Sequence, residues 1–218
     1  MLYRILKRIS DVTLSAILLA ATLPFVLIYS LAVLLFWKTN PFFIQERAVG
    51  LRGGSFSIMK IRTLKPGAEV FKFRDSRLVS SSDFLPLGRI LRRTGVDELP
   101  QLLLVLSGKM SIIGPRPLML DDIAMIAEKY PGLMEHRSKM KCLPGISGLW
   151  QLKRSSAVSY DELHTYDLDY ASKRSILFDW KLMGLTAVKM LQGYHLDALQ
   201  SIPESETKQT ITLPSHNS

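Results

Sequence analysis

The sequence predicts an α+β fold that is mostly helical, in which an apolar N-terminal segment joins a compact domain with a small β-hairpin. Three observations lead to this prediction. Residues 12–37 are uncharged and almost wholly apolar, residues 55–63 alternate apolar and polar positions, and later stretches repeat apolar residues at helical spacing. We therefore divide the chain into a membrane anchor at 1–40, a folded domain at 41–195 and a mobile tail at 196–218. The tail is rich in Ser, Thr, Glu and Pro and has no periodicity, as disordered segments do.

Composition limits the classes of partner. The 218 residues are enough for one domain with a core, 47% of them are hydrophobic, and the formal net charge is +9. A basic body beside an apolar segment indicates anionic lipid headgroups, phosphate-bearing substrates, or both. The sequence has no helix-turn-helix, zinc-finger or RNA-binding motif, so we expect no nucleic acid. The single cysteine, Cys142, excludes an internal disulfide.

The N-terminal segment is long enough to enter or cross a membrane, because about 20 helical residues cover the roughly 30 Å hydrocarbon core of a bilayer. Pro24 lies near its middle, lacks an N–H and clashes with the carbonyl of Ala20, which predicts a kink or a break. The alternatives are a kinked spanning helix and a re-entrant helix–break–helix with Pro24 at its deepest point. Basic residues lie on both flanks: Arg4, Lys7 and Arg8 before the segment, and Lys38, Arg47 and Arg52 after it. Since basic residues favour the cytoplasmic side, this arrangement favours the re-entrant form.

Residues 41–49 and 55–63 predict the two strands of a hairpin, separated by a glycine-rich turn at 50–54. In the second strand the apolar residues Phe56, Ile58 and Ile61 alternate with the polar residues Ser57, Lys60 and Arg62. Without a further motif, a solvated strand face is the simpler interpretation of Lys60 and Arg62.

Helical periodicity appears in four later stretches, at about 85–93, 98–107, 119–130 and 178–192. The first carries Arg92 among other arginines. The second is nearly all apolar and too short to span a membrane, so it is a core helix or lies against lipid. The last two are amphipathic and suit a membrane interface. Residues 65–83 are polar and aperiodic, and we expect a loop with a short helix there.

An acidic pair, Asp97 and Glu98, opens the apolar stretch and is followed by Pro100 and Gln101. Adjacent residues on an α-helix point about 100° apart, so the two carboxylates suit different tasks, such as attack on phosphorus and metal binding. With Asp97 as N-cap, Pro100 would fall in the first turn, and the free amides of the helix start would face a phosphate. The simpler alternative is plain helix capping.

Arg116 lies between two prolines, Pro115 and Pro117, which stiffen its backbone. Its planar guanidinium can hold two phosphate oxygens at once, and a surface salt bridge is the alternative. Substrates with a diphosphate usually arrive with Mg²⁺, which one or two carboxylates hold. The pattern therefore predicts phosphate chemistry with Mg²⁺ as the cofactor.

Residues 94–117 resemble the core motif of the bacterial sugar transferases, the monotopic phosphoglycosyl transferases. Four further blocks resemble the same family: Lys7-Arg8 with Asp11; Lys60-Ile61-Arg62-Thr63; Pro144 to Gln151; and Asp167-x-x-Tyr170, Ser175 and Asp179-x-Lys181. Each block is weak alone, but the ordered set runs from residue 7 to about residue 190.

The resemblance implies transfer of a sugar 1-phosphate from a UDP-sugar to polyprenol (undecaprenyl) phosphate, with release of UMP, at the cytoplasmic face of the bacterial inner membrane. It implies that Asp97 is the nucleophile, forming a phospho-aspartyl intermediate, and that Glu98 is the Mg²⁺ ligand. The expected substrate-binding residues are Lys60, Arg62, Arg92, Gln101, Arg116, Gln151 and Arg154. Membrane lipids are the other expected partner, and a homo-oligomer is left open.

Two other functions remain open at this point. A non-catalytic membrane-anchored scaffold or regulator would be expected to lose Asp97 or Glu98, and both are present. A glycosyl transferase that acts at the sugar carbon would release UDP instead of UMP. The sequence reveals neither the sugar nor the glycan pathway.

Overall fold

The computed structural model describes residues 2–49, 54–68, 81–153 and 160–192. The predicted tail and Arg154 lie outside these residues. The first half of the chain contains α1 (Leu2–Trp37), β1 (Phe42–Ala48), β2 (Phe56–Ile61), η1 (Ser81–Asp83), α2 (Gly88–Thr94), η2 (Val96–Gln101) and α3 (Leu102–Leu106). The second half contains β3 (Ser111–Ile113), β4 (Leu118–Met119), α4 (Leu120–Lys129), α5 (Pro131–Ser138), β5 (Gly145–Ser147), α6 (Leu149–Lys153), α7 (Tyr160–Lys173) and α8 (Ile176–Leu191).

The predicted hairpin is confirmed. β1 and β2 pair antiparallel, from Phe42 opposite Ile61 to Arg47 opposite Phe56. β4 adds to the other edge of β1, so the sheet has the order β2-β1-β4. A second, parallel pair joins β3 to β5. The sequence did not predict β3, β4 or β5, because strands of two or three residues are too short to show an alternating pattern.

The predicted helices at about 85–93, 119–130 and 178–192 are confirmed as α2, α4 and α8. The stretch at 98–107 is not one helix, since a 3₁₀ helix (η2) precedes a five-residue α-helix (α3). Pro100 lies inside η2 and lacks the N–H that a regular α-helix would use there. The sequence did not predict α5, α6 or α7.

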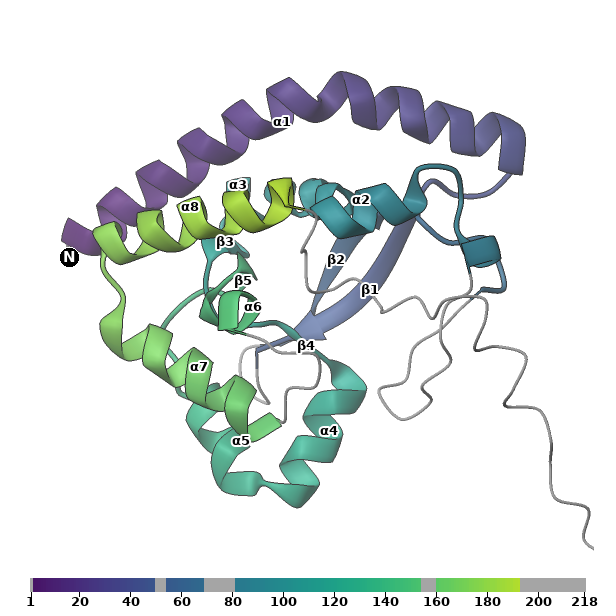
Figure 1. Cartoon of the computed structure of the whole chain (residues 1–218). Coiled ribbons are helices and arrows are strands. Elements are labelled where there is room, and N and C mark those ends of the chain that lie inside the picture. The colour runs from purple at the N-terminus through teal and green to yellow at the C-terminus, as the bar shows by residue number, and fades with distance from the viewer. Residues whose placement is uncertain (1, 50–53, 69–80, 154–159, 193–218) are drawn as a thin grey trace, which may run out of the picture.

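The predicted break at Pro24 is wrong, because α1 continues through it as a single 36-residue helix. Figure 1 shows the helix bent near its middle, as an interior proline requires. Thr22 Oγ1 donates to the carbonyl of Leu18 at 2.7 Å, a local bond of the kind that supports proline-containing apolar helices. By length and composition α1 could cross a membrane, with a mean hydropathy of 2.4 in its most apolar window.

One face of α1 is buried against the folded domain. Its buried residues are Asp11, Ser15, Tyr29, Ser30 and Val33. From Asp11 through Ser15 and Tyr29 to Val33 the steps are four, fourteen and four residues, close to whole turns of 3.6 residues, which keeps these four on one side of the helix, with Ser30 beside Tyr29. In Figure 1, α1 runs across α8, α3 and α2, above the sheet.

Charged and hydroxyl groups attach the first turns of α1 to the domain. Ser111 Oγ donates to Asp11 Oδ2 at 2.7 Å, and Lys7 Nζ lies 3.2 Å from both Asp11 Oδ1 and Asp179 Oδ2. Tyr170 donates to Asp179 Oδ1 at 2.9 Å, and Asp179 itself is fully buried. This network joins α1 to β3, α7 and α8.

Apolar contacts attach the C-terminal half of α1 instead. Tyr29 and Val33 pack with Ile61, Leu85 and Leu91, which come from β2, the segment before α2, and α2 itself. Both halves of α1 therefore contact the same folded domain.

The opposite face of α1 is apolar and exposed. The exposed residues there include Ile17, Leu27, Ile28, Leu31, Leu34, Leu35 and Phe36. The adjoining helix α8 exposes Leu177, Trp180, Leu185, Val188 and Leu191. Soluble proteins rarely expose so much contiguous apolar surface, whereas a membrane would cover it.

Candidate active site

A glycine places the acidic pair directly after α2. Gly95 has φ 69°, in the left-handed region, where it ends α2 and begins η2. Its N–H bonds to the carbonyl of Arg92 at 3.2 Å. The chain thus turns within one residue, and η2 follows α2 directly.

Asp97 and Glu98 are both buried, with 6% and 4% of their surfaces exposed. Gly95 occupies the N-cap position of η2, so the alternative in which Asp97 only caps a helix does not apply. A 3₁₀ helix turns about 120° per residue, which separates the two carboxylates and places Glu98 and Gln101 on one face. The arrangement agrees with two different tasks for the pair.

Lys60 contacts the acidic pair, and Arg92 lies in the last turn of α2, which directly precedes η2. Lys60 Nζ, from β2, forms an ion pair with Glu98 Oε1. Arg92 Nε donates to Thr63 Oγ1 at 2.8 Å. Arg62 Nε instead donates to the carbonyl of Asn40 at 2.6 Å, which ties it to the connection between α1 and β1.

Gln101 carries a buried amide that suits a bound group. The residue is 3% exposed, and its Nε2 has no hydrogen-bond partner within the described part of the chain. Because buried donors are nearly always paired, such a group indicates a contact that a ligand would complete.

Arg116 and Gln151 lie in a second group, around Trp150. The guanidinium carbon of Arg116 lies 4.3 Å from the centre of the Trp150 ring, a cation–π contact. Trp150 Nε1 donates to the carbonyl of Gly114 at 3.3 Å, and Gln151 is buried beside it. The sequence analysis did not select Trp150 as a site residue; its position next to Gln151 was the available signal.

The two groups lie toward opposite ends of β1. Lys60 pairs with Phe43, whereas Arg47 pairs with Met119, just after Pro117. Four residues along a strand cover about 13 Å. We name the residues around η2 the acidic site and the residues around Trp150 the Arg116 site.

A buried ion pair lies behind Arg116. Arg137 and Asp167 are each 1% exposed at the side chain, and Arg137 Nη1 bonds Asp167 Oδ2. Burial raises the pKa of the Asp167 carboxyl, and the Arg137 guanidinium beside it acts in the opposite direction. The sequence analysis missed Arg137, since a single arginine in a polar stretch gives no signal of burial.

The acidic pair fits Mg²⁺. Among the described residues no group of three or more His, Cys, Asp or Glu gathers as a metal site. Mg²⁺ does not need one, because it usually binds through one or two carboxylates together with substrate phosphates and water. Asp97 and Glu98 provide that donor set.

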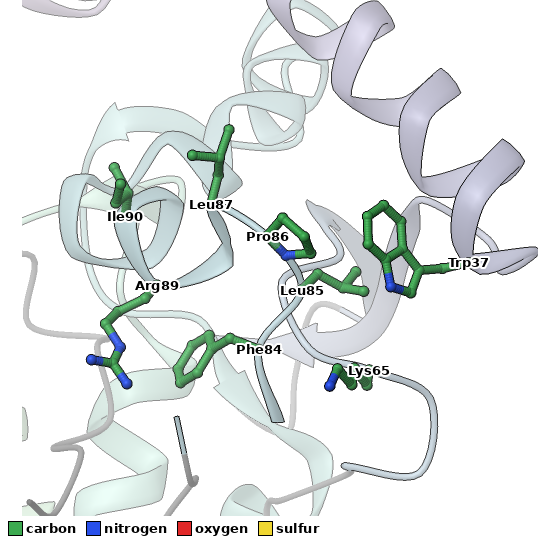
Figure 2. Close-up of a pocket in the computed structure, with 8 residues that line it drawn as sticks. All are labelled: Trp37, Lys65, Phe84, Leu85, Pro86, Leu87, Arg89 and Ile90. Carbon is green, nitrogen blue, oxygen red and sulfur yellow. The ribbon is translucent and has the colours of Figure 1, made fainter. Parts of the chain in front are cut away.

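A cavity of about 560 Å³ lies beside α2, as Figure 2 shows. Its lining residues are Trp37, Lys65, Phe84, Leu85, Pro86, Leu87, Arg89 and Ile90. The cavity does not include the acidic pair. Phe84 connects the two places, because the guanidinium carbons of Arg89 and Arg92 lie 5.6 and 6.0 Å from its ring centre.

The chain matches the model of the bacterial sugar transferase family over residues 2–193. It is 34% identical over 190 residues to the uncharacterized sugar transferase EpsL of Bacillus subtilis, a match that covers 86% of this chain and 88% of that protein. The UDP-glucose:undecaprenyl-phosphate glucose-1-phosphate transferase of Escherichia coli is 31% identical over 192 residues, covering 85% of this chain and 40% of that protein. The undecaprenyl-phosphate galactose phosphotransferase of Salmonella typhimurium is 30% identical over 207 residues, covering 87% of this chain and 41% of that protein.

The family match and the names of these relatives indicate an enzyme of the phosphoglycosyl transferase class, and the apolar helix α1 indicates a membrane anchor. The chain belongs to the bacterial sugar transferase family.

Proposed function

We propose that this enzyme transfers a sugar 1-phosphate from a UDP-sugar to undecaprenyl phosphate and releases UMP. The observation that carries the proposal is the buried acidic pair on η2, with Lys60 on Glu98 and Arg92 nearby. The names of the relatives in Escherichia coli and Salmonella typhimurium support the lipid acceptor and the sugar-phosphate group.

The reaction has two displacements at one phosphorus atom. A carboxylate oxygen of Asp97 attacks the phosphorus that bears the sugar, and the bond to the bridging oxygen breaks as UMP leaves. The sugar phosphate is then an acyl phosphate on Asp97. An oxygen of the lipid phosphate attacks the same phosphorus, frees the carboxylate and forms the diphosphate. The bond between the sugar carbon and its oxygen stays intact throughout.

The other residues of the acidic site position the substrate and neutralise the charge of its diphosphate. Glu98 would hold Mg²⁺, which neutralises the diphosphate when bound. Lys60 fixes Glu98 through their ion pair. The Gln101 amide donates to a substrate oxygen, which gives its buried Nε2 a partner. Arg116 holds the phosphate of the nucleotide at the far end of the site.

The cavity beside α2 suits the lipid acceptor. Its wall is mostly apolar, which fits an isoprenoid chain, and Lys65 and Arg89 supply positive charge for a phosphate. The exposed apolar side chains of Leu87 and Ile90 continue the wall toward the surface. Phe84 and Arg92 then lead from the cavity to the acidic site.

We also propose that α1 lies in one leaflet and returns to the cytoplasmic face, without crossing the membrane. Residues near both ends of α1 contact one folded domain, through Lys7 and Asp11 at one end and Tyr29 and Val33 at the other. A helix that left the domain to cross the bilayer would lose one of these sets. A bend at Pro24 accounts for the change of direction without a break.

Nucleotide release tests the reaction. Purified protein is incubated with undecaprenyl phosphate, Mg²⁺ and a panel of UDP-sugars, and UMP and UDP are separated. We expect UMP from a subset of the sugars. Release of UDP would indicate transfer at the sugar carbon, and no release with any sugar would favour a scaffold; either result contradicts the proposal.

Cysteine labelling of intact cells tests the topology. Arg4→Cys and Thr39→Cys, each in a Cys142→Ser background, place single thiols at the two ends of α1. Both should resist a membrane-impermeant reagent in intact cells and react after lysis. Labelling of either thiol in intact cells would mean that α1 spans the membrane.

A further inference from the structure

We propose that Arg137 and Asp167 are positioning residues that fix the backbone of Arg116, and through it the guanidinium that meets the substrate. This inference rests on the proposed function for the role of Arg116. We call these two residues the Arg137–Asp167 clamp.

The clamp bonds both backbone groups of Arg116, its carbonyl and its N–H. Arg137 Nη2 donates to the Arg116 carbonyl at 2.6 Å, and the Arg116 N–H donates to Asp167 Oδ1 at 3.2 Å. Arg137 Nε donates to the carbonyl of Val49 at 3.1 Å, and its Nη1 bonds the other oxygen of Asp167. All three nitrogens of one guanidinium are thus engaged, with partners in three different segments.

Because Arg116 lies between two prolines, few hydrogen bonds can hold the backbone of this segment, and the clamp makes two of them. Pro115 and Pro117 have no N–H, so Arg116 supplies the only backbone donor of the three residues. Asp167 takes that donor. The three carbonyls are taken as well, by the Gly145 N–H at 2.9 Å for Pro115, by Arg137 for Arg116, and by Arg47 Nη1 at 3.4 Å for Pro117.

A buried ion pair is costly to build and is not needed for stability alone, since apolar residues of similar size often replace one without loss. Here the pair bonds both the N–H and the carbonyl of one residue, Arg116, and Arg137 also bonds the carbonyl of Val49. The geometry therefore fits a role in orientation. With the backbone fixed, the Arg116 side chain keeps its stack on Trp150 and presents its N–H groups in one direction.

A double-mutant cycle tests the coupling between the clamp and Arg116. Arg137→Lys keeps a charge near Asp167 but cannot make the three directed bonds. We expect it to lower kcat/KM for the UDP-sugar about tenfold, with little change in KM for the lipid acceptor. In an Arg116→Ala background the same substitution should cause no further loss. An equal loss in both backgrounds would mean a general structural role and would overturn the proposal.

Two further variants accompany the cycle: a control at an exposed ion pair and a second change within the clamp. Lys139→Ala, which removes an exposed ion pair with Glu135 at the end of α5, should leave kinetics unchanged. Asp167→Asn keeps an oxygen that can accept from the Arg116 N–H but loses the charge that faces Arg137. We expect it to lower kcat/KM less than Arg137→Lys; a larger loss from Asp167→Asn would contradict the assignment of the main contact to Arg137.

A spectroscopic measurement separates this inference from the proposed function. In a Trp37→Phe, Trp180→Phe background, Trp150 is the remaining tryptophan. Arg137→Lys should change its emission in the same direction as Arg116→Ala, because both remove the cation from the ring. This result would support the clamp even if no UDP-sugar were turned over. Unchanged emission in Arg137→Lys, with a change in Arg116→Ala, would overturn it.

Discussion

The acidic site and the Arg116 site are built in different ways. Gly95, Asp97, Glu98 and Gln101 all belong to one short stretch around η2, and the turn at Gly95 sets their directions. The backbone of Arg116 is held by Arg137 and Asp167, which lie 21 and 51 residues further along the chain. The reacting groups therefore come from local structure, whereas the binding group depends on distant contacts.

This difference predicts different consequences of substitution. A change at the acidic site should remove chemistry and leave the fold in place, because Asn and Gln keep the size and shape of the carboxylates that they replace. A change at the clamp should alter the orientation of Arg116 and loosen the segments it joins.

Asp97→Asn should lower turnover by at least about a thousandfold, because an amide cannot form the phospho-aspartyl intermediate. Intact-protein mass spectrometry without the lipid acceptor should detect a sugar-phosphate adduct on the wild type and none on the variant. The thermal unfolding midpoint should stay near that of the wild type. Turnover near the wild-type rate in the variant would exclude the covalent mechanism.

Arg116→Lys should lower kcat/KM for the UDP-sugar roughly ten- to a hundredfold, since one ammonium group replaces a planar fork with two parallel donors. Lysine also loses the planar stack on Trp150. Steady-state kinetics with the lipid acceptor at saturation measure the effect. If kinetics are unchanged, Arg116 is a surface residue with no substrate contact, and the substrate site consists of the acidic site alone.

Glu98→Gln should mainly change the response to Mg²⁺. The amide still accepts from Lys60 but binds a cation more weakly, so half-maximal activity should need roughly tenfold more Mg²⁺. Activity is titrated against Mg²⁺ for both proteins at the same UDP-sugar concentration. Identical titration curves would show that Glu98 is no metal ligand and would leave its ion pair with Lys60 as its role.

The same contrast explains what the sequence could predict. Local patterns predicted the hairpin, α2, α4 and α8, and they drew attention to the acidic pair. The roles of Asp97, Glu98 and Arg116 in the reaction stay predictions. Local patterns failed where a tertiary contact determines the structure. The residues next to Arg137 in the sequence give no signal that Asp167 is its partner. The helices α5 and α7 have too little apolar periodicity to be predicted from sequence.

Two alternatives that the sequence left open are decided by local structure. The sequence predicted a kink or a break at Pro24, and α1 continues through it, because a helix can lose one hydrogen bond and bend while the others remain. An N-cap at Asp97 was one alternative, but Gly95 takes the left-handed conformation and starts η2 two residues earlier.

The smallest expected effect uses Cys142 as a reporter of the clamp. Burial raises the pKa of the Cys142 thiol, and the charge of Arg174 lowers it. The charge of Asp167 also raises this pKa, and that of Arg137 lowers it. Because the thiolate is the reactive form, Cys142 should react more slowly at pH 8 than an exposed cysteine. Arg137→Lys should loosen these surroundings and accelerate the reaction about two- to fivefold, whereas Asp97→Asn should leave the rate unchanged. The rate of modification by a small thiol reagent is measured for all three proteins. If Asp97→Asn accelerates the reaction as much as Arg137→Lys does, the two sites are not structurally independent, and the contrast between them fails.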